Sequence, residues 1–200
     1  MNSKEENKIK FLEIYKNIKR QGADELLAWI IRSDFFIAPA STMFHGNYNG
    51  ALCEHSINVY NLFREKNKRY DLGLNEESIA IMGLLHDLCK VNYYKPTTRN
   101  KKIDGQWKAI PWYDVDDSFA IGHGEKSVIM IQQFMKLSGE EMIGIRWHMG
   151  GYESKENYRT LSTAWAKYKS GSCLHTADLE ASNLLEEHID YEHPQIKMNV

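Results

Sequence analysis

Cysteine is scarce in this sequence, and no two cysteines lie close together. The 200 residues hold three, Cys53, Cys89 and Cys173, and none forms a C-x-x-C pair. An odd number of dispersed cysteines argues against a disulfide framework and is typical of reduced thiols in the cytoplasm. We therefore expect a cytoplasmic protein with unpaired thiols.

Long apolar runs and an excess of charge are also absent. No stretch approaches the about 20 apolar residues of a membrane span, and residues 1–10 lack the apolar core of a signal peptide. The formal charge of -2 and the pI near 6.4 give no net attraction to nucleic acid or to an anionic membrane, although a local basic patch is not excluded. These absences predict a soluble protein with no membrane partner. Its length suits one domain.

Helical periodicity is what the chain does have. Apolar residues recur every three to four positions, which predicts an all-α bundle. We expect helices over about residues 4–20, 76–88, 139–148 and 160–168. Four more helices are expected to begin at about residues 24, 51, 125 and 172. Asp24, Asn75 and Ser138 are the expected N-caps, and Glu141 would complete a capping box with Ser138.

One segment breaks this periodicity. Asp104-Gly105, a favoured two-residue hairpin turn, lies between two extended runs and predicts a small β-hairpin insertion near residues 95–114. Insertions of this length are often lids or binding loops, and this one combines basic with aromatic residues, among them Arg99, Lys101, Trp107 and Trp112. We expect a substrate lid. Its aromatics could stack on a base, but packing on their own domain is the favoured interpretation.

The residues on which the function depends lie at the end of an apolar run, in Gly83-Leu84-Leu85-His86-Asp87-Leu88-Cys89-Lys90. Polar groups at the end of a buried helix must be hydrogen-bonded, paired or bound to metal. A His-Asp pair alone is weak evidence, because this composition gives about 0.4 such pairs by chance. The evidence is the ordered set of metal-capable residues around it, namely His55, His123, His148 and Asp178.

Imidazole nitrogens and carboxylate oxygens, with no thiolate suitably placed, suit divalent ions such as Mn²⁺, Fe²⁺, Co²⁺, Ni²⁺ or Zn²⁺. One ion would generate hydroxide at neutral pH, and a second about 3.5 to 4 Å away would orient a phosphate. Simpler interpretations exist for each residue taken singly. His55 could be a satisfied core histidine, and His123 and His148 could cap backbone groups.

The order His55, His86-Asp87, His123, His148, Asp178 resembles that of the HD superfamily of metal-dependent phosphohydrolases. The resemblance spans about residues 38–187. Gly50-Ala51-Leu52-Cys53-Glu54-His55-Ser56 is similar to the family's Gly-Gly-Leu-Leu-Glu-His-Ser, and Leu84 to Lys90 to its hydrophobic-HD-x-Gly-Lys. The segment Ala177 to Ser182 is similar to its late aspartate helix. Cys89 stands where the family has glycine.

This resemblance implies roles for individual residues. His55, His86, Asp87 and Asp178 would hold a first metal, with Asp87 placed to bridge. His123 and His148 would bind a second metal ion or contact phosphate. We therefore expect one or two divalent ions, and Mg²⁺ is among the candidates. Lys90 would meet a phosphate oxygen. We count Asp87, Lys90 and Arg146 as catalytic, although Arg146 and Lys90 could be solvated surface residues.

Four further histidines lie outside this ordered set. His45 lies where similar proteins often carry histidine and could line the pocket. His175 precedes Asp178 by one helical turn. It could orient the metal ligands through a hydrogen bond or lie on the helix surface. His188 and His193 belong to the tail. We expect an N-terminal helical extension packed on the core over residues 1–36, an HD phosphohydrolase domain over 37–188 and a C-terminal tail over 189–200.

The expected function is phosphomonoester or phosphodiester hydrolysis by metal-activated water. The acidic pI favours a small nucleotide or other phosphoester as substrate, whereas the basic-aromatic insertion would suit a 3′-5′ exoribonuclease-like nuclease. Two alternatives stay open: a non-catalytic HD-fold nucleotide-binding protein and an HD oxygenase with a diiron centre.

Overall fold

The computed structural model describes residues 3–42 and 44–190, and the described chain is mostly helical. His193 and the rest of the predicted tail beyond residue 190 lie outside the described residues. Eight α-helices are present in the described ranges. They are α1 (Lys4–Tyr15), α2 (Ala23–Arg32), α3 (Ala51–Tyr70), α4 (Glu76–Leu85), α5 (His123–Gln132), α6 (Gly139–Arg146), α7 (Tyr158–Lys167) and α8 (Lys169–Glu180). A 3₁₀ turn, η1 (Leu88–Lys90), follows α4, and a π-helical turn, η4 (Ala181–Leu185), extends α8.

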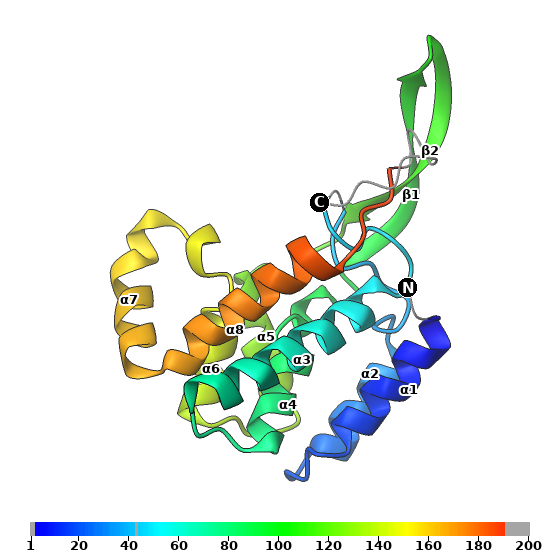
Figure 1. Cartoon of the computed structure of the whole chain (residues 1–200). Helices are drawn as coiled ribbons and strands as arrows, with labels where there is room; N and C mark the ends of the chain where they lie inside the picture. Colours follow the sequence, from blue (N-terminus) through cyan, green and yellow to red (C-terminus); the bar gives the residue numbers. More distant parts are fainter. Residues whose placement is uncertain (1–2, 43, 191–200) are drawn as a thin grey trace.

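The long helix α3 lies at the centre of the bundle and packs against α1, α4 and α8 (Figure 1). One hydrophobic cluster runs through these helices and includes fully buried residues of α1, α2 and α4 such as Phe11, Leu26 and Leu85. The ring of Phe11 lies 4.8 Å from that of Phe35. The N-terminal helices thus share the core of the chain that carries the predicted site.

Glycine at position 83 allows α4 to approach α3 closely. A Cβ atom there would lie 2.6 Å from the Cα of Tyr60 in α3, closer than two such atoms can pack. This contact lies one turn before His86 on α4 and five residues after His55 on α3. The close approach therefore brings the two imidazoles together.

Two of the three predicted N-caps are confirmed. Asn75 accepts a hydrogen bond from the Ser78 amide, and Ser138 forms the capping box with Glu141. Asp24 is wrong as a cap: α2 begins at Ala23 after Gly22, whose φ of 87° places it in the left-handed region, and Asp24 lies in the first turn. The last helix begins at Lys169 instead of Ser172, because α8 follows α7 with almost no connecting residues.

The predicted hairpin is confirmed, as β1 (Tyr94–Ile103) and β2 (Gln106–Val115). The strands pair antiparallel from Tyr94 opposite Val115 to Ile103 opposite Gln106. Asp104 and Gly105 have φ values of 50° and 81°, the positive values that this turn requires. Figure 1 shows the hairpin extending away from the helices, and Trp107 near its tip is 73% exposed. The expectation that the aromatic side chains of the hairpin pack on their own domain is therefore wrong for Trp107. That the hairpin acts as a substrate lid stays a prediction.

The helices of the described ranges are all too short or too polar to cross a membrane.

Candidate metal centre

Residues from three helices converge at the end of α4. The Nε2 atom of His55 on α3 lies 3.1 Å from Nε2 of His86, 3.2 Å from Oδ1 of Asp178 on α8 and 3.3 Å from Oδ2 of Asp87. His55 and His86 are fully buried, and Asp87 is 2% exposed. The structure thus brings together the four residues expected around a first metal.

The other oxygen of Asp87 faces the second pair of histidines. His123 at the start of α5 places Nε2 2.7 Å from Oδ1 of Asp87, and His148 after α6 places Nε2 3.5 Å from the same atom. The rings of His86 and His148 lie 4.9 Å apart. Asp87 therefore stands between two groups of nitrogen donors, one for each of its oxygens.

Backbone hydrogen bonds fix which nitrogen of each imidazole faces the cluster. Nδ1 of His86 donates to the Gly83 carbonyl at 2.9 Å, and Nδ1 of His148 donates to the Ile145 carbonyl at 2.6 Å. In the neutral imidazole the other nitrogen then carries a lone pair. In the neutral form of each ring, Nε2 therefore turns its lone pair toward the cluster.

His148 shows the consequence most clearly. Its Nε2 is buried and has no hydrogen-bond partner among the residues that the structure describes. Buried polar atoms are rarely left unsatisfied, because the lost hydration is not recovered. Burial acts to lower the pKa of His148, but Asp87, whose Oδ1 lies 3.5 Å away, outweighs it and raises this pKa, so positive charge between the two atoms is favourable. The donor set fits a bound cation.

The spacing of the donor atoms fits an ion of ordinary size. Nitrogen and oxygen ligands lie about 2.0 to 2.2 Å from a divalent transition metal, which places neighbouring ligands about 3.0 to 3.5 Å apart. The distances of 3.1, 3.2 and 3.3 Å around His55 Nε2 fall in that range. These atoms need little rearrangement to share an ion.

The pKa shifts of His86, Asp87 and Asp178 suit metal binding. Burial lowers the pKa of His86 to about 3, so this imidazole is neutral near pH 7. Burial acts to raise the pKa of Asp87, but the nearby Lys90 and His86 outweigh it and hold this pKa well below its usual value. For Asp178, burial is likewise outweighed by the hydrogen bond from His55, and its pKa is lowered. The cluster thus offers ionised carboxylates and a neutral imidazole.

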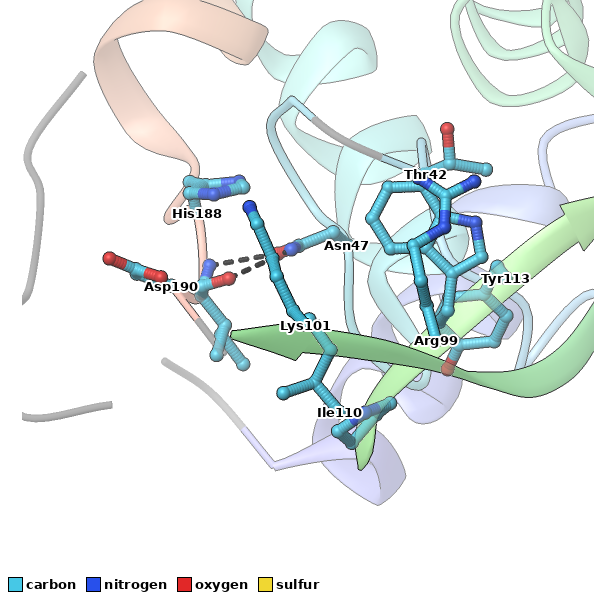
Figure 2. A pocket seen from close by; sticks show the side chains of 11 residues that line it. Thr42, Asn47, Arg99, Lys101, Ile110, Tyr113, His188 and Asp190 are labelled. Atoms are coloured by element: carbon cyan, nitrogen blue, oxygen red, sulfur yellow. Dashed lines mark hydrogen bonds between the residues drawn. The ribbon is translucent and has the colours of Figure 1, made fainter. Parts of the chain in front are cut away.

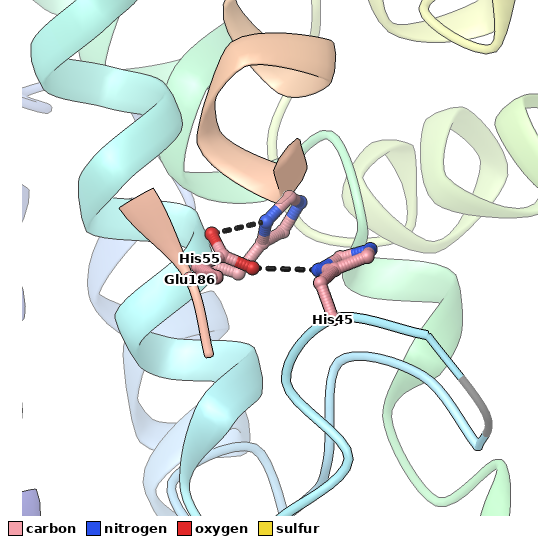
Figure 3. A group of neighbouring side chains, drawn as sticks. All are labelled: His45, His55 and Glu186. Atoms are coloured by element: carbon pink, nitrogen blue, oxygen red, sulfur yellow. Dashed lines mark hydrogen bonds and ion pairs between the residues drawn. The ribbon is translucent and has the colours of Figure 1, made fainter. Parts of the chain in front are cut away.

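Glu186 is a partner of the site that the sequence did not reveal. Figure 3 shows its carboxylate between two histidines: one oxygen lies 2.9 Å from Nδ1 of His55 and the other 2.6 Å from Nδ1 of His45. Donation of the His55 Nδ1 proton to a carboxylate fixes the ring with Nε2 toward the other donors. Glu186 follows the π-helical turn after α8, where no periodic pattern marks it as buried.

His45 and His175 both lie behind the cluster. His45 contacts Glu186, and its ring lies 5.1 Å from that of His55. Nδ1 of His175 donates to the His148 carbonyl at 2.7 Å, and its ring stacks on Trp165. His175 therefore holds the backbone of a cluster residue.

The expectation that no thiolate is suitably placed is wrong. Sγ of Cys89 lies 3.4 Å from Nδ1 and 3.6 Å from Nε2 of His123. The η1 turn curls the chain directly after Asp87, and the Cys89 amide donates to Ser127 Oγ on α5 at 3.1 Å. This packing of the turn on α5 carries the thiol toward His123. Burial raises the pKa of Cys89 to about 12, so it is a neutral thiol where no cation is near.

The two predicted cationic residues differ in their surroundings. Nζ of Lys90 lies 2.7 Å from Oδ2 of Asp87; burial acts to lower its pKa, but Asp87 outweighs this and raises it. Arg146 instead pairs with Glu125 at 2.5 Å and Glu153 at 2.7 Å. Lys90 is thus at the cluster, whereas Arg146 contacts two carboxylates beside it, and its catalytic role stays a prediction.

A cavity of about 240 Å³ opens beside Cys89 and His123. Lys90 and Lys126 also line it, and Nζ of Lys126 lies 2.6 Å from Oδ1 of Asp117 at its rim. Lys126 was not singled out in the sequence, because a lysine in the first turns of a helix is ordinarily a surface residue. The cavity gives the His123 side of the cluster access to a ligand.

Comparison with known families agrees with this geometry. The family model of the HD domain matches residues 52–190, well over half of the chain. The chain belongs to the HD-domain family. The match includes every one of the six residues expected to bind metal, and it confirms the resemblance seen in the sequence. The HD domain places the protein in a superfamily of metal-dependent phosphohydrolases that also has non-catalytic members. No curated protein and no solved structure matches the chain.

Proposed function

We propose that this HD-domain protein is a metal-dependent phosphohydrolase that hydrolyses a phosphoester of a nucleotide. The observation that supports this most strongly is the placement of Asp87, whose two oxygens face two separate groups of buried donors beside a lysine-lined cavity. A bound divalent ion supplies a water of lowered pKa and positive charge for the phosphoryl oxygens. Phosphoester hydrolysis needs both.

The side chains divide into two groups around Asp87. His55, His86 and Asp178, with Asp87, would hold a first ion, and His123 and His148, with Asp87, would hold a second. Glu186 keeps the His55 ring oriented through its 2.9 Å contact. Because His55 and His86 are fully buried and His123 lines the cavity, a phosphoester that enters the cavity would meet His123 first.

Two lysines favour an anionic ligand in the cavity. Lys90 presents an ammonium group 2.7 Å from Asp87, and Lys126 lines the same cavity. An ammonium group binds phosphate oxygens as a point charge. Lys126 would exchange its contact with Asp117 for the phosphate, and Lys90 would hold a non-bridging oxygen next to Asp87.

A substrate panel tests this function. Metal-free protein is supplied with Mn²⁺, Co²⁺, Ni²⁺, Zn²⁺ or Mg²⁺ and offered nucleoside mono- and triphosphates, cyclic nucleotides and oligonucleotides. We expect hydrolysis that proceeds without O₂ and is lost in Asp87→Asn. Lys126→Ala should raise KM more than it lowers kcat, and Lys136→Ala, a change outside the cavity, should do neither. Ion binding without turnover on any substrate would favour the non-catalytic alternative, and an O₂-dependent product would favour the oxygenase.

A nucleic-acid end is a second candidate substrate, and the hairpin is the observation that favours it. The strand register places Arg99, Lys101, Lys108 and Trp112 on one face. The Arg99 guanidinium lies 4.0 Å from the centre of the Trp112 ring. A pocket of about 220 Å³ lies between this face and residues 188–190, which Asn47 holds by two hydrogen bonds to Ile189 (Figure 2).

Aromatic and cationic groups on one face are suited to stacked bases and backbone phosphates. If the substrate is a strand, Arg99→Ala should raise KM for an oligonucleotide and leave KM for a mononucleotide unchanged. Lys102→Ala is the matched control, because Lys102 lies on the opposite face of the same strand. Equal effects of the two variants would remove this candidate.

A further inference from the structure

We propose that Cys89 is a metal ligand, through Sγ, of the outer ion at Asp87 and His123. This inference rests on the proposed metal centre and deepens it. Asp87, Cys89 and His123 each offer a donor atom, and these atoms lie within 4.8 Å of one another. The three residues come from the end of the HD motif, the η1 turn and the start of α5.

The distance between sulfur and nitrogen suits a shared ion. In tetrahedral coordination a thiolate lies about 2.3 Å and an imidazole nitrogen about 2.0 to 2.1 Å from zinc, so the two ligand atoms lie about 3.5 Å apart. Sγ of Cys89 and Nε2 of His123 are separated by 3.6 Å. Nε2 of His123 and Oδ1 of Asp87, at 2.7 Å, must separate slightly to admit the ion.

A second observation points to the same ion position independently of the thiol. Nε2 of His148, fully buried and without a hydrogen-bond partner among the described residues, is aimed at Oδ1 of Asp87. The rings of His148 and His123 lie 5.1 Å apart. The outer group therefore has four donors of different kinds: the Asp87 oxygen, the Cys89 sulfur and the nitrogens of His123 and His148.

The backbone does not require cysteine at position 89. The HD motif that this segment resembles has glycine there, and glycine contributes no donor. Cys89 is not among the described residues with positive φ, so the turn accepts a side chain without strain. The thiol is 97% shielded from solvent, yet it borders the cavity. Cysteine at position 89, in place of the glycine of the HD motif, thus adds a sulfur donor where the outer ion would lie.

A sulfur ligand has a consequence for metal choice. Thiolates bind Zn²⁺, Co²⁺ and Fe²⁺ much better than the hard ions Mg²⁺ and Mn²⁺. The inner group of His55, His86 and Asp178 offers nitrogen and oxygen alone. The two positions should therefore differ in preference, the outer one selecting zinc, cobalt or ferrous iron.

Cobalt spectroscopy tests the proposal without an activity assay. Chelator-treated full-length protein is titrated anaerobically with Co²⁺ while absorbance is recorded. Wild type should develop visible d–d bands and, as the outer position fills, the near-ultraviolet band of sulfur-to-cobalt charge transfer. Cys89→Ser and Cys89→Gly should keep d–d bands, lose the charge-transfer band and bind the outer ion at least tenfold more weakly. Cys53→Ser is the matched control, because Cys53 is equally buried but on the far side of α3 from His55, and it should behave as wild type.

The possible results separate this inference from the proposed function. Cobalt binding with d–d bands but no charge-transfer band in wild type, or a band that persists in Cys89→Ser, overturns the sulfur ligand and leaves the metal centre standing. No cobalt binding to folded wild type overturns both. Circular dichroism of each variant establishes that it is folded, and Cys89→Gly supplies a second test if the serine variant is not.

Discussion

Nε2 of His148 and Oδ1 of Asp87 face each other across 3.5 Å in the protein interior, and this nitrogen has no hydrogen-bond partner among the described residues. The hydrogen bond from Nδ1 of His148 to the Ile145 carbonyl fixes this arrangement. A buried imidazole nitrogen without a hydrogen-bond partner, held opposite a carboxylate oxygen, indicates that a cation belongs between them.

The first prediction concerns Asp87, the residue common to both groups of donors. Asp87→Asn should reduce divalent-ion affinity at least 100-fold and abolish hydrolysis, because it removes the negative charge that both ions would share. The helical circular dichroism signal should change little. Ion binding measured by titration calorimetry checks this. Binding at wild-type strength would show that the carboxylate is no ligand.

The second prediction concerns Glu186, which orients His55 without joining the cluster. Glu186→Gln should weaken ion binding about 10- to 100-fold, the usual effect of removing a carboxylate behind a ligating histidine. Glu180→Gln is the control, because the partly exposed Glu180 on α8 pairs with Lys66 instead of a histidine of the cluster. If the two variants retain equal affinity, Glu186 has a structural role alone.

The third prediction concerns the contact that joins α3 and α4. Gly83→Ala should lower the free energy of unfolding by about 1 to 3 kcal/mol, because its methyl group would overlap the backbone of Tyr60. It should also weaken ion binding by moving His86 away from His55. At Gly151 a Cβ would have no neighbour within 4 Å, so Gly151→Ala should change stability by under about 0.5 kcal/mol. Thermal or urea unfolding compares the pair, and equal stabilities would contradict the close approach.

The fourth prediction concerns pH and a carboxylate remote from the cluster. Burial acts to raise the pKa of Glu141, but the hydrogen bonds from Arg20, at 2.6 and 2.9 Å, outweigh it and lower this pKa. A carboxylate whose pKa is lower in the folded than in the unfolded state stabilises the fold above its unfolded-state pKa of about 4.3 and loses that effect as the pH falls toward the folded-state value.

Near pH 7, Glu141→Gln should therefore lower the free energy of unfolding by about 2 to 4 kcal/mol, since it leaves Arg20 without a buried partner. The difference from wild type should shrink as the pH is lowered from about 5 to 3. Glu5→Gln, an exposed change in the first turn of α1, should show no such pH dependence. A difference that grows on acidification would contradict the assigned direction of the pKa shift.

Local signals in the sequence account for much of this fold. Asn75 and Ser138 were identifiable as caps because their hydrogen bonds reach only three residues along the chain, and Asp104-Gly105 identified the hairpin for the same reason. The ordered histidines and aspartates indicated which side chains would meet, and the structure brings them together. Their action as ligands stays a prediction.

Long-range packing accounts for what the sequence did not reveal. Glu186 meets His55 across 131 positions of the chain, and Cys89 meets His123 across 34, through a turn whose direction is set by its packing on α5. No periodicity records such contacts. Gly22 replaced Asp24 as the cap of α2 because the chain reverses there in a left-handed conformation, which glycine adopts without strain.

The most direct measurement is a crystal structure of the protein grown with excess Mn²⁺ and Zn²⁺, with anomalous diffraction recorded for each metal. We expect one anomalous peak enclosed by His55, His86, Asp87 and Asp178, and a zinc peak on the Asp87 side of His123 within ligand distance of Cys89. Electron density that shows these side chains ordered as described, with no anomalous peak among them, would contradict the account.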